Sequence, residues 1–165
     1  MSALAPDALP IRRLASGERR PVLQVFAGLS ERSRRLRFLG PKPVLREREL
    51  EHLVDVGCCG REAVVATHPE TGDALGIARY VRQGADPATA EVAFEVVDEW
   101  QGLGVGSRLA SALVEIAAEN GIRRLHAAVA PENRAALALL RKLGRVEWTS
   151  FVDGAYEVVV AVELS

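Results

Sequence analysis

Several residue types that mark whole classes of protein are scarce in this sequence. Aromatic side chains make up 5% of its 165 residues, and the formal net charge at pH 7 is −1. Without a basic excess, the chain has no global field to attract a nucleic acid. The three histidines, His52, His68 and His126, lack the spacing of metal ligands. We therefore expect neither a nucleic-acid partner nor a metal site.

Cysteines and long apolar runs are equally scarce. The two cysteines, Cys58 and Cys59, are neighbours, and normal disulfide geometry needs Cα atoms farther apart than one peptide bond allows. No stretch reaches the roughly 18 apolar residues that can span a bilayer. The first residues also lack the basic and apolar segments of a secretory signal. We therefore expect a cytoplasmic protein with no membrane partner.

What is present is the ordinary composition of a folded domain, with 48% apolar and 26% charged residues. The length allows one full hydrophobic core but not two comfortable ones. The chain contains neither an internal repeat nor a low-complexity linker. We expect residues 1–8 to form a disordered tail and residues 9–165 to form a single domain.

Hydrophobic periodicity divides the chain into helices and strands. Strands are predicted at 9–14, 63–66, 75–82, 90–97, 124–130, 146–152 and 156–164. Helices are predicted at 16–27, 30–38, 45–56, 106–121 and 131–144. Ser16 and Ser30 are the expected N-caps of the first two helices, and Gly121 and Gly144 are expected to end the last two. This order predicts one α/β domain with a mixed sheet.

A strand that runs through a glycine-rich turn into a helix is the most informative feature. The turn extends from Gln101 to Gly106. Free N–H groups in the first turn of a helix bind anions, and glycines let a phosphate oxygen approach the backbone closely. The dinucleotide pattern G-x-G-x-x-G fails because Ser107 stands at its last position, and the Walker pattern is absent. A tight strand-to-helix connection without a ligand is the alternative.

The spacing Gln101-x-x-Gly104-x-Gly106 resembles the pyrophosphate motif of the GNAT superfamily of acetyltransferases. The acidic-aromatic segment 98–100 that leads into it is similar to that of the superfamily as well. Downstream, at a family-like distance, the segment 133–144 looks like the superfamily's asparagine-containing helix that ends in Leu-Gly. The chain therefore resembles a GNAT acetyltransferase.

This resemblance implies a GNAT-like α/β (α+β) fold, in which a twisted, mixed sheet of six to seven strands is flanked by helices and splayed open to admit acetyl-CoA. It implies that backbone groups around Glu95, Val96 and Val97 bind the pantetheine, and that the Asn133 side chain contacts the CoA arm. The pyrophosphate would be held by backbone N–H groups of Gln101, Gly102, Leu103, Gly104, Val105, Gly106 and Ser107. Acetyl-CoA is the expected cosubstrate, with no metal.

Transfer to an amine needs a base, because an alkylammonium group is protonated near neutral pH. Glu91 and Glu95 lie on one face of the predicted strand. The strand is otherwise apolar, and placing a carboxylate there costs free energy, which suggests that the group has a function. The setting of Glu91, ten residues before Gln101, resembles that of the basic glutamate in lysine acetyltransferases of the superfamily. We predict Glu91 as the catalytic base and Glu95 as the second choice. A solvent-facing glutamate without a catalytic role is the alternative.

One position departs from the superfamily pattern. Many members carry a tyrosine seven residues after the asparagine to protonate the departing thiolate, and Leu140 occupies that position here. Leucine cannot donate a proton. We expect the thiolate either to leave as such or to take a proton from water or from another donor such as Tyr156.

The expected acceptor comes from a second resemblance. Segments 26–38 and 90–102 resemble the acetyltransferase domain of bacterial Pat-type protein lysine acetyltransferases, which often lack the tyrosine as well. A protein lysine is therefore the expected acceptor. A small-molecule amine and a non-catalytic acetyl-CoA-sensing role are the alternatives. Homodimers are common in the superfamily, although the sequence identifies no interface.

The arginines from Arg32 to Arg37 form the one strongly basic segment. Such a cluster can meet an acidic protein surface or the CoA 3′-phosphate. A solvated helix face with a structural arginine–carboxylate pair is an equally good interpretation.

Overall fold

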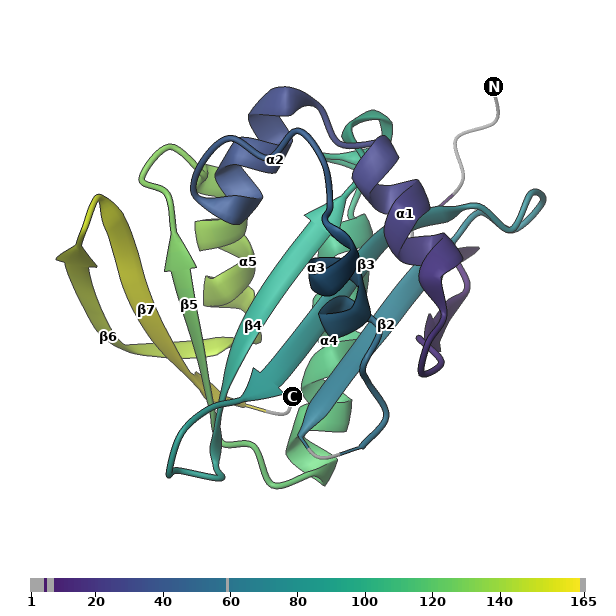
Figure 1. The fold of residues 1–165 in the computed structure, drawn as a ribbon. Coiled ribbons are helices and arrows are strands. Elements are labelled where there is room, and N and C mark those ends of the chain that lie inside the picture. Colours follow the sequence, from purple (N-terminus) through teal and green to yellow (C-terminus); the bar gives the residue numbers. More distant parts are fainter. Residues whose placement is uncertain (1–4, 6–7, 59, 164–165) are drawn as a thin grey trace.

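A seven-stranded mixed sheet forms the centre of the protein, in the order β1-β2-β3-β4-β5-β7-β6 (Figure 1). The computed structural model describes residues 5, 8–58 and 60–163. The strands are β1 (Ile11–Arg13), β2 (Arg61–Thr67), β3 (Ala74–Arg82), β4 (Thr89–Val96), β5 (Arg124–Val129), β6 (Gly144–Val152) and β7 (Ala155–Val162). This architecture confirms the predicted α/β fold. Most of the predicted tail, residues 1–8, lies outside the described residues, as does Cys59.

Helices cover both faces of the sheet. They are α1 (Arg19–Ala27), α2 (Glu31–Phe38), α3 (Glu47–Leu53), α4 (Val105–Glu119) and α5 (Arg134–Leu143). In the view of Figure 1, α1, α2 and α3 lie in front of the sheet and α4 lies behind it. The helices in front and α4 behind therefore pack against opposite faces of the sheet.

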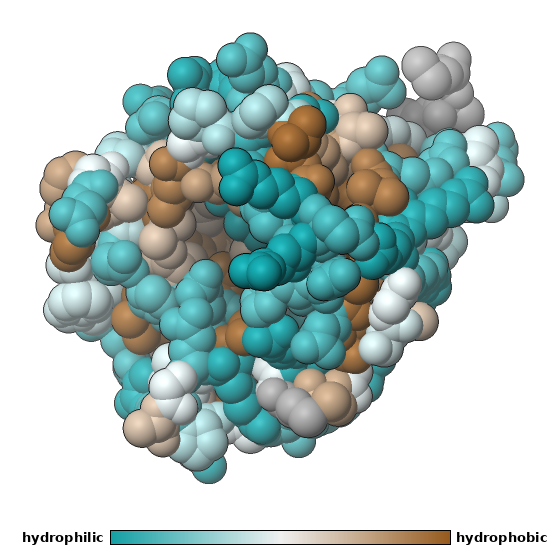
Figure 2. Space-filling model, viewed as in Figure 1, coloured by the Kyte–Doolittle hydropathy of each residue, from teal (hydrophilic) through white to brown (hydrophobic). Residues whose placement is uncertain are grey.

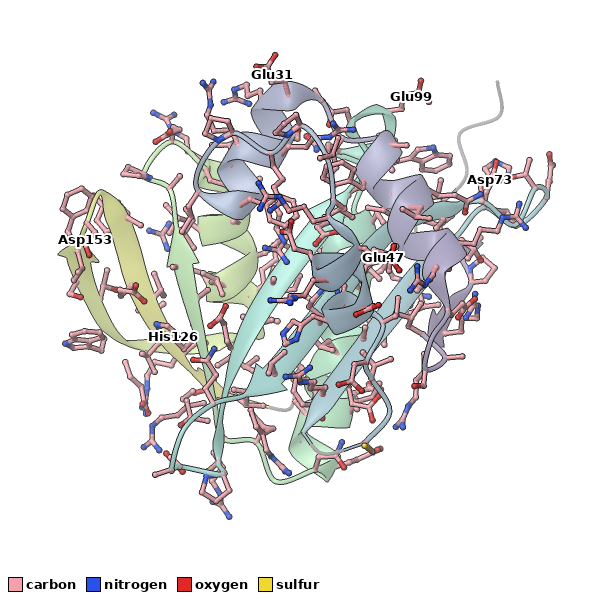
Figure 3. All side chains as sticks on the ribbon, in the orientation of Figure 1. Glu31, Glu47, Asp73, Glu99, His126 and Asp153 are labelled. Atoms are coloured by element: carbon pink, nitrogen blue, oxygen red, sulfur yellow. The ribbon has the colours of Figure 1, made fainter. Side chains whose placement is uncertain are left out.

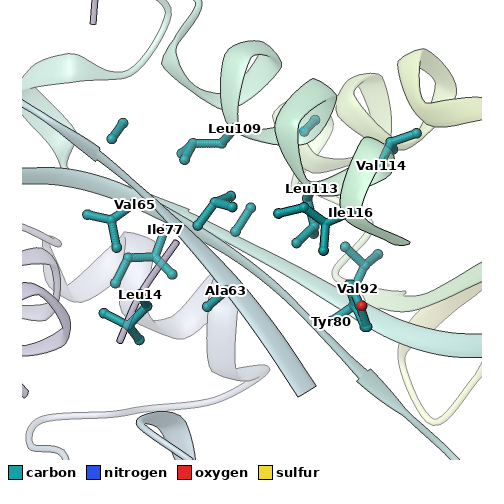
Figure 4. Close-up of a cluster of buried hydrophobic side chains, with 14 of the residues drawn as sticks. Leu14, Ala63, Val65, Ile77, Tyr80, Val92, Leu109, Leu113, Val114 and Ile116 are labelled. Atoms are coloured by element: carbon teal, nitrogen blue, oxygen red, sulfur yellow. The ribbon is translucent and has the colours of Figure 1, made fainter. Parts of the chain in front are cut away.

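The hydrophobic core lies on both sides of the strands. Leu109 and Leu113 of α4 are fully buried on one side, and Leu14 is buried on the other (Figure 4). The spacing of four residues places Leu109 and Leu113 on one face of their helix. Burying each such side chain stabilises the fold by roughly 1.5–3 kcal/mol. The core therefore fixes β3 and β4 between α4 and the helices in front.

Strands β4 and β5 pair in parallel, whereas the other neighbouring strands are antiparallel. The parallel pairing follows from the crossover through α4 that joins the two strands. It covers Thr89–Glu91 against Arg124–His126, although both strands continue beyond these residues. Past Glu91 and His126 the strands part, and this separation opens the sheet.

Three helices begin later than predicted, and α3 begins at Glu47 rather than at residue 45. The N-cap position of α1 is Glu18 rather than Ser16, with no side-chain cap bond; the Glu18 carboxylate instead accepts the Ala15 N–H and two bonds from the Arg12 guanidinium. The last helix starts after Asn133, whose side chain caps it, rather than at Pro131. The predicted cap of α2 is confirmed, since Ser30 Oγ accepts the Ser33 N–H at 3.1 Å.

Candidate functional site

The separation of β4 and β5 forms a cleft of about 580 Å³, lined by α2, β4, the β4–α4 loop, β5 and α5. In Figure 2 it is the hollow between α2 and the β5–β7 side of the molecule. Of the predicted site residues, those that line it are Glu91, Glu95, Val96, Gln101, Gly102, Gly106 and Asn133. Those that do not line it are Val97, Leu103, Gly104, Val105 and Ser107. Val97 lines a shallower neighbouring pocket beside α1 instead.

The N-terminus of α4 closes one end of this cleft and has the features of an anion site. Gly104, its N-cap, has a φ of 89°, and Gly102 has a φ of 75°, so both adopt the left-handed conformation that glycine tolerates best. No side chain caps this helix and no acidic residue stands in its first turn. The N–H groups of that turn therefore remain available to a phosphate, and the helix dipole favours the negative charge.

A cation that the sequence analysis did not single out lies at the same place. Lys142 Nζ, in the last turn of α5, donates to Ser107 Oγ at 3.0 Å. Only the packing of α5 against α4 brings these residues together, because they are far apart in the chain. Lys142 adds positive charge beside the helix N-terminus, which suits a pyrophosphate better than a neutral ligand.

Gln101 is engaged within the protein. Its backbone N–H donates to Asp98 O at 3.2 Å, and its side-chain Nε2 donates to Val96 O at 2.9 Å. Both groups therefore hold the β4–α4 loop against the end of β4. Among the N–H groups predicted to face the pyrophosphate, those from Gly102 onward are the ones left for it.

The backbone of β4 offers one unpaired edge to the cleft. The Val97 N–H donates to Leu75 O on the β3 side, and the same ladder aligns Gly76 with Val96. Because backbone groups alternate sides along a strand, the N–H groups of Val96 and Phe94 point toward β5, where the two strands have parted. Val96 is thus the residue of the predicted group 95–97 whose N–H can pair with an extended ligand.

Asn133 stands where α5 begins. Its Oδ1 accepts the Ala136 N–H at 3.2 Å, so the oxygen is used to cap the helix. The side chain lines the cleft, and its Nδ2 donor is left to face a ligand.

The two predicted catalytic glutamates occupy different environments on the same face of β4. Glu91 is exposed at the fork where β4 and β5 part, and Gln83 Nε2 donates to its Oε2 at 2.5 Å. Glu95 is buried, with 3% of its side chain exposed, and its Oε1 accepts from Arg37 Nε at 2.8 Å. The exposed carboxylate is the one that an incoming group can reach.

A second arginine, Arg79 of the neighbouring strand β3, lies close to Glu95. Arg79 Nη2 is 3.8 Å from Glu95 Oε1, and Arg79 Nη1 donates to Leu53 O at 3.0 Å. Burial lowers the pKa of the Arg79 guanidinium, while the charge of Glu95 raises it and that of Arg37 lowers it. The structural arginine–carboxylate pair considered for the basic segment is thus present, formed by Arg37.

Neither Leu140 nor Tyr156 provides a proton donor for the thiolate at the cleft. Leu140 lines the cleft and is fully buried. Tyr156 packs edge-on against Phe151, with ring centroids 5.3 Å apart, and is not among the lining residues. Of the alternatives predicted from the sequence, departure of an unprotonated thiolate or protonation by water agrees best with this arrangement.

Other kinds of site were also sought in the described part of the chain. Residues 5, 8–58 and 60–163 contain no group of three or more His, Cys, Asp or Glu side chains that could hold a metal ion. None of the described helices combines the length and apolar character that crossing a membrane requires.

Comparisons with known proteins agree with this geometry. A model of the acetyltransferase (GNAT) family matches residues 31–144. The chain is 38% identical over 97 residues to the acetyltransferase Pat of Mycolicibacterium smegmatis, a match that covers 59% of this chain and 29% of that protein. It is 32% identical over 138 residues to the acetyltransferase PA5475 of Pseudomonas aeruginosa, covering 82% of this chain and 74% of that one.

Comparison with a solved structure supports the same fold. The GNAT domain of PAT from S. lividans superimposes with a TM-score of 0.83 and 27% identity, covering 93% of this chain and 90% of that one. The family match includes β4, the glycine-rich turn and the Asn133 helix, which are the elements that build the cleft. The chain therefore belongs to the GNAT family of N-acetyltransferases, whose fold implies acetyl-CoA as the cosubstrate.

Proposed function

We propose that the protein transfers the acetyl group of acetyl-CoA to a primary amine, and that the amine is the side chain of a protein lysine. The observation that carries this proposal is one continuous cleft, with the α4 N-terminus at one end and the exposed Glu91 at the fork of the strands. An anion site and a carboxylate are the two features that amine acetylation from a CoA thioester requires.

Acetyl-CoA supplies the activated thioester carbonyl. The first-turn N–H groups of α4, together with Lys142, would hold its pyrophosphate. The Val96 N–H and the Asn133 Nδ2 would hold the arm between the strands. These contacts would place the carbonyl in the gap between β4 and β5, near the exposed carboxylate at the fork.

The protein's own residues then accept one proton, the one that the amine loses. Glu91 takes up the proton that the amine loses, directly or through a water, as the nitrogen–carbon bond forms and the carbon–sulfur bond breaks. The CoA sulfur leaves as a thiolate, whose proton comes from solvent. Gln83, just past the end of β3, holds the Glu91 carboxylate in a fixed orientation through its bond to Oε2.

A protein lysine is proposed as the acceptor because the chain resembles Pat-type enzymes in segments 26–38 and 90–102. The cleft is also open, and its rim carries exposed Arg32 and Leu39, which a protein surface can cover. The alternatives are a small-molecule amine and a non-catalytic acetyl-CoA sensor. The use of acetyl-CoA supports a cytoplasmic location, and a homodimer is proposed from its frequency in the superfamily.

The test is thiol release from acetyl-CoA, followed with a chromogenic thiol reagent. The acceptors are an Nα-acetylated lysine peptide, the same peptide with arginine in place of lysine, spermidine and free amino acids. Wild-type protein is compared with Glu91→Gln, and CoA binding is measured separately by calorimetry. We expect turnover of the lysine peptide and a loss of about 10²–10⁴ in kcat for Glu91→Gln, with CoA affinity unchanged.

The other outcomes separate the alternatives. Turnover of spermidine or an amino acid, with none of the lysine peptide, would favour the small-molecule enzyme. CoA binding without release of thiol on any acceptor would favour the sensor. Failure to bind CoA would contradict the proposed function and both alternatives.

A further inference from the structure

Helix α2 forms a wall of the cleft without being part of the hydrophobic core. None of its residues is buried, yet Arg32, Ser33 and Leu36 line the cleft opposite β4. Figure 3 shows Glu31 at the outer end of this helix, pointing to solvent. A helix of eight residues without a buried face is marginal in water by itself. Apart from the edge-on contact of Phe38 with Phe26, at 6.1 Å between ring centroids, polar contacts hold it in place.

Two sets of contacts act at the ends of α2. At its start, the Ser30 N–H donates to Asp98 Oδ1 at 3.1 Å. On its outer side, Arg34 donates to Phe26 O at 2.9 Å and to Pro43 O at 3.0 Å, so it ties the helix to neighbouring loops. Neither set reaches β4, which forms the other wall of the cleft.

The charged contact between α2 and β4 is the pair Arg37–Glu95, in which the carboxylate is buried and the guanidinium half-buried. The nitrogen and oxygen atoms are 2.8 Å apart, with 20% and 3% of the two side chains exposed. The pair continues to Arg79 on β3 and from there to the Leu53 carbonyl at the end of α3. The chain of contacts thus joins α2, β4, β3 and α3 in one buried ionic network.

The network has an excess of one positive charge, because two guanidinium groups share one carboxylate. Glu95 Oε1 accepts a hydrogen bond from Arg37 Nε at 2.8 Å and lies 3.8 Å from Arg79 Nη2. A carboxylate held this way neutralises the charge of the arginines around it, and its Oε1 is already occupied by Arg37. Glu91, in contrast, is exposed and contacts a neutral amide.

We propose that Glu95 and Arg37 are positioning residues that hold α2 against β4 as the acceptor-side wall of the cleft, and that Glu95 does not serve as the base. This assignment rests on the proposed amine acetyltransferase function. It predicts that breaking the pair weakens use of the acceptor while leaving the acetyl-CoA site intact. The reason is that the groups proposed to hold acetyl-CoA belong to the β4 backbone, α4 and α5, whereas α2 supplies none of them and meets the β4–α4 loop where Gln101 Nε2 donates to Ser33 Oγ at 3.3 Å.

The variant of choice is Arg37→Gln, since it leaves Glu95 paired with Arg79 and creates no excess of buried charge. Glu95→Gln would leave two buried cations together and risks misfolding. The matched control is Arg35→Gln, which removes an exposed arginine from the same helix and does not touch the cleft lining. All proteins are checked for thermal unfolding before they are compared.

The first readout needs no turnover. Amide hydrogen exchange is measured on the full chain, and we expect α2 of Arg37→Gln to exchange roughly tenfold faster than in wild type or Arg35→Gln, with α4 unchanged. The second readout is kinetic, with the amine that the acceptor panel shows to be used best. We expect a KM for the amine raised by about tenfold or more, with the KM for acetyl-CoA unaltered.

The outcomes that would overturn the proposal are specific. One is α2 exchange in Arg37→Gln equal to that in Arg35→Gln. Another is a folded Glu95→Gln protein that loses kcat and the acidic limb of its pH–rate profile as Glu91→Gln does, since Glu95 would then be the base. If no acceptor is turned over, the exchange data still decide whether the pair holds α2. Failure of the proposed function can therefore be told apart from failure of the positioning role.

Discussion

Glu91 lies opposite His126 in the last pair that joins β4 and β5 before the strands separate. Residues paired across parallel strands face the same side, so both side chains lie on the face of the sheet that Figure 3 turns to the viewer, where His126 is labelled. His126 in turn contacts Glu157 of β7 through Nε2. A row of polar groups therefore crosses the sheet at the point where the cleft begins, and Glu91 is its member on the cleft wall.

Removing the partner of Glu91 should reduce catalysis without affecting the cosubstrate. In Gln83→Ala the carboxylate loses the amide that fixes its orientation. We expect kcat to fall by roughly threefold to tenfold, because orientation rather than the base itself is lost. Steady-state kinetics should show an unchanged KM for acetyl-CoA. A loss as large as that of Glu91→Gln would mean that Gln83 has a chemical role of its own.

The glycine at the start of α4 offers a paired test of the anion site. Gly104→Ala and Gly17→Ala both place a Cβ on a residue with positive φ, 89° and 79° respectively. Each should lose about 1 kcal/mol of folding free energy or slightly more, measured by urea denaturation. Calorimetry should show weaker CoA binding for Gly104→Ala alone, because Gly17 is remote from the cleft. Equal CoA affinity in the two variants would argue against phosphate binding at this turn.

Position 140 tests whether the thiolate needs an acid. Leu140 is fully buried, so Leu140→Tyr and Leu140→Phe both overpack the core and should lose about 1–3 kcal/mol of stability. The two variants differ only in the hydroxyl group. We expect the same kcat for both in the thiol-release assay, since the thiolate leaves without a side-chain donor. A faster tyrosine variant would show instead that proton donation limits the wild-type enzyme.

The pair Arg12–Glu18 predicts a pH dependence of stability. Hydrogen bonding to the Arg12 guanidinium holds the pKa of the Glu18 carboxyl below its ordinary value, and the Ala15 N–H adds to this effect against partial desolvation. A lowered pKa in the folded state gives stability that is complete above the unfolded-state pKa of about 4.3 and is lost as the pH falls through the lowered value.

Glu18→Gln should therefore be less stable than wild type by roughly 0.5–1 kcal/mol at pH 7, and the difference should shrink toward pH 3. Urea denaturation at the two pH values measures it. Arg20→Gln is the control, because Arg20 is exposed and its ion-pair partner within the described part of the chain is Asp73, at 4.0 Å. A difference that grows as the pH falls would contradict the assigned direction.

Much of the fold could be predicted because its signals are local. The glycines of the turn after β4, the Ser30 cap and the leucines four residues apart in α4 each act within one or two turns of chain. The same holds for the anion site, whose N–H groups come from consecutive residues. The start of the first helix was not predicted, because Ser16 is a favoured cap by residue type, whereas α1 begins after Glu18, whose side chain bonds to Arg12 and to the Ala15 N–H.

The sequence by itself determined the order of elements, the glycine-rich turn and the family that they indicate. It placed Glu91 and Glu95 on one face of one strand and ranked Glu91 first on its resemblance to the family's basic glutamate, with no information on the environment of either carboxylate. Only the tertiary structure separated them, because α2 brings Arg37 onto Glu95 and β3 brings Arg79 beneath it, whereas Glu91 stays exposed at the fork. The contact of Lys142 with Ser107 likewise depends on how α5 packs on α4. Contacts between residues far apart in the chain set the burial and charge around a carboxylate, and no local pattern encodes them.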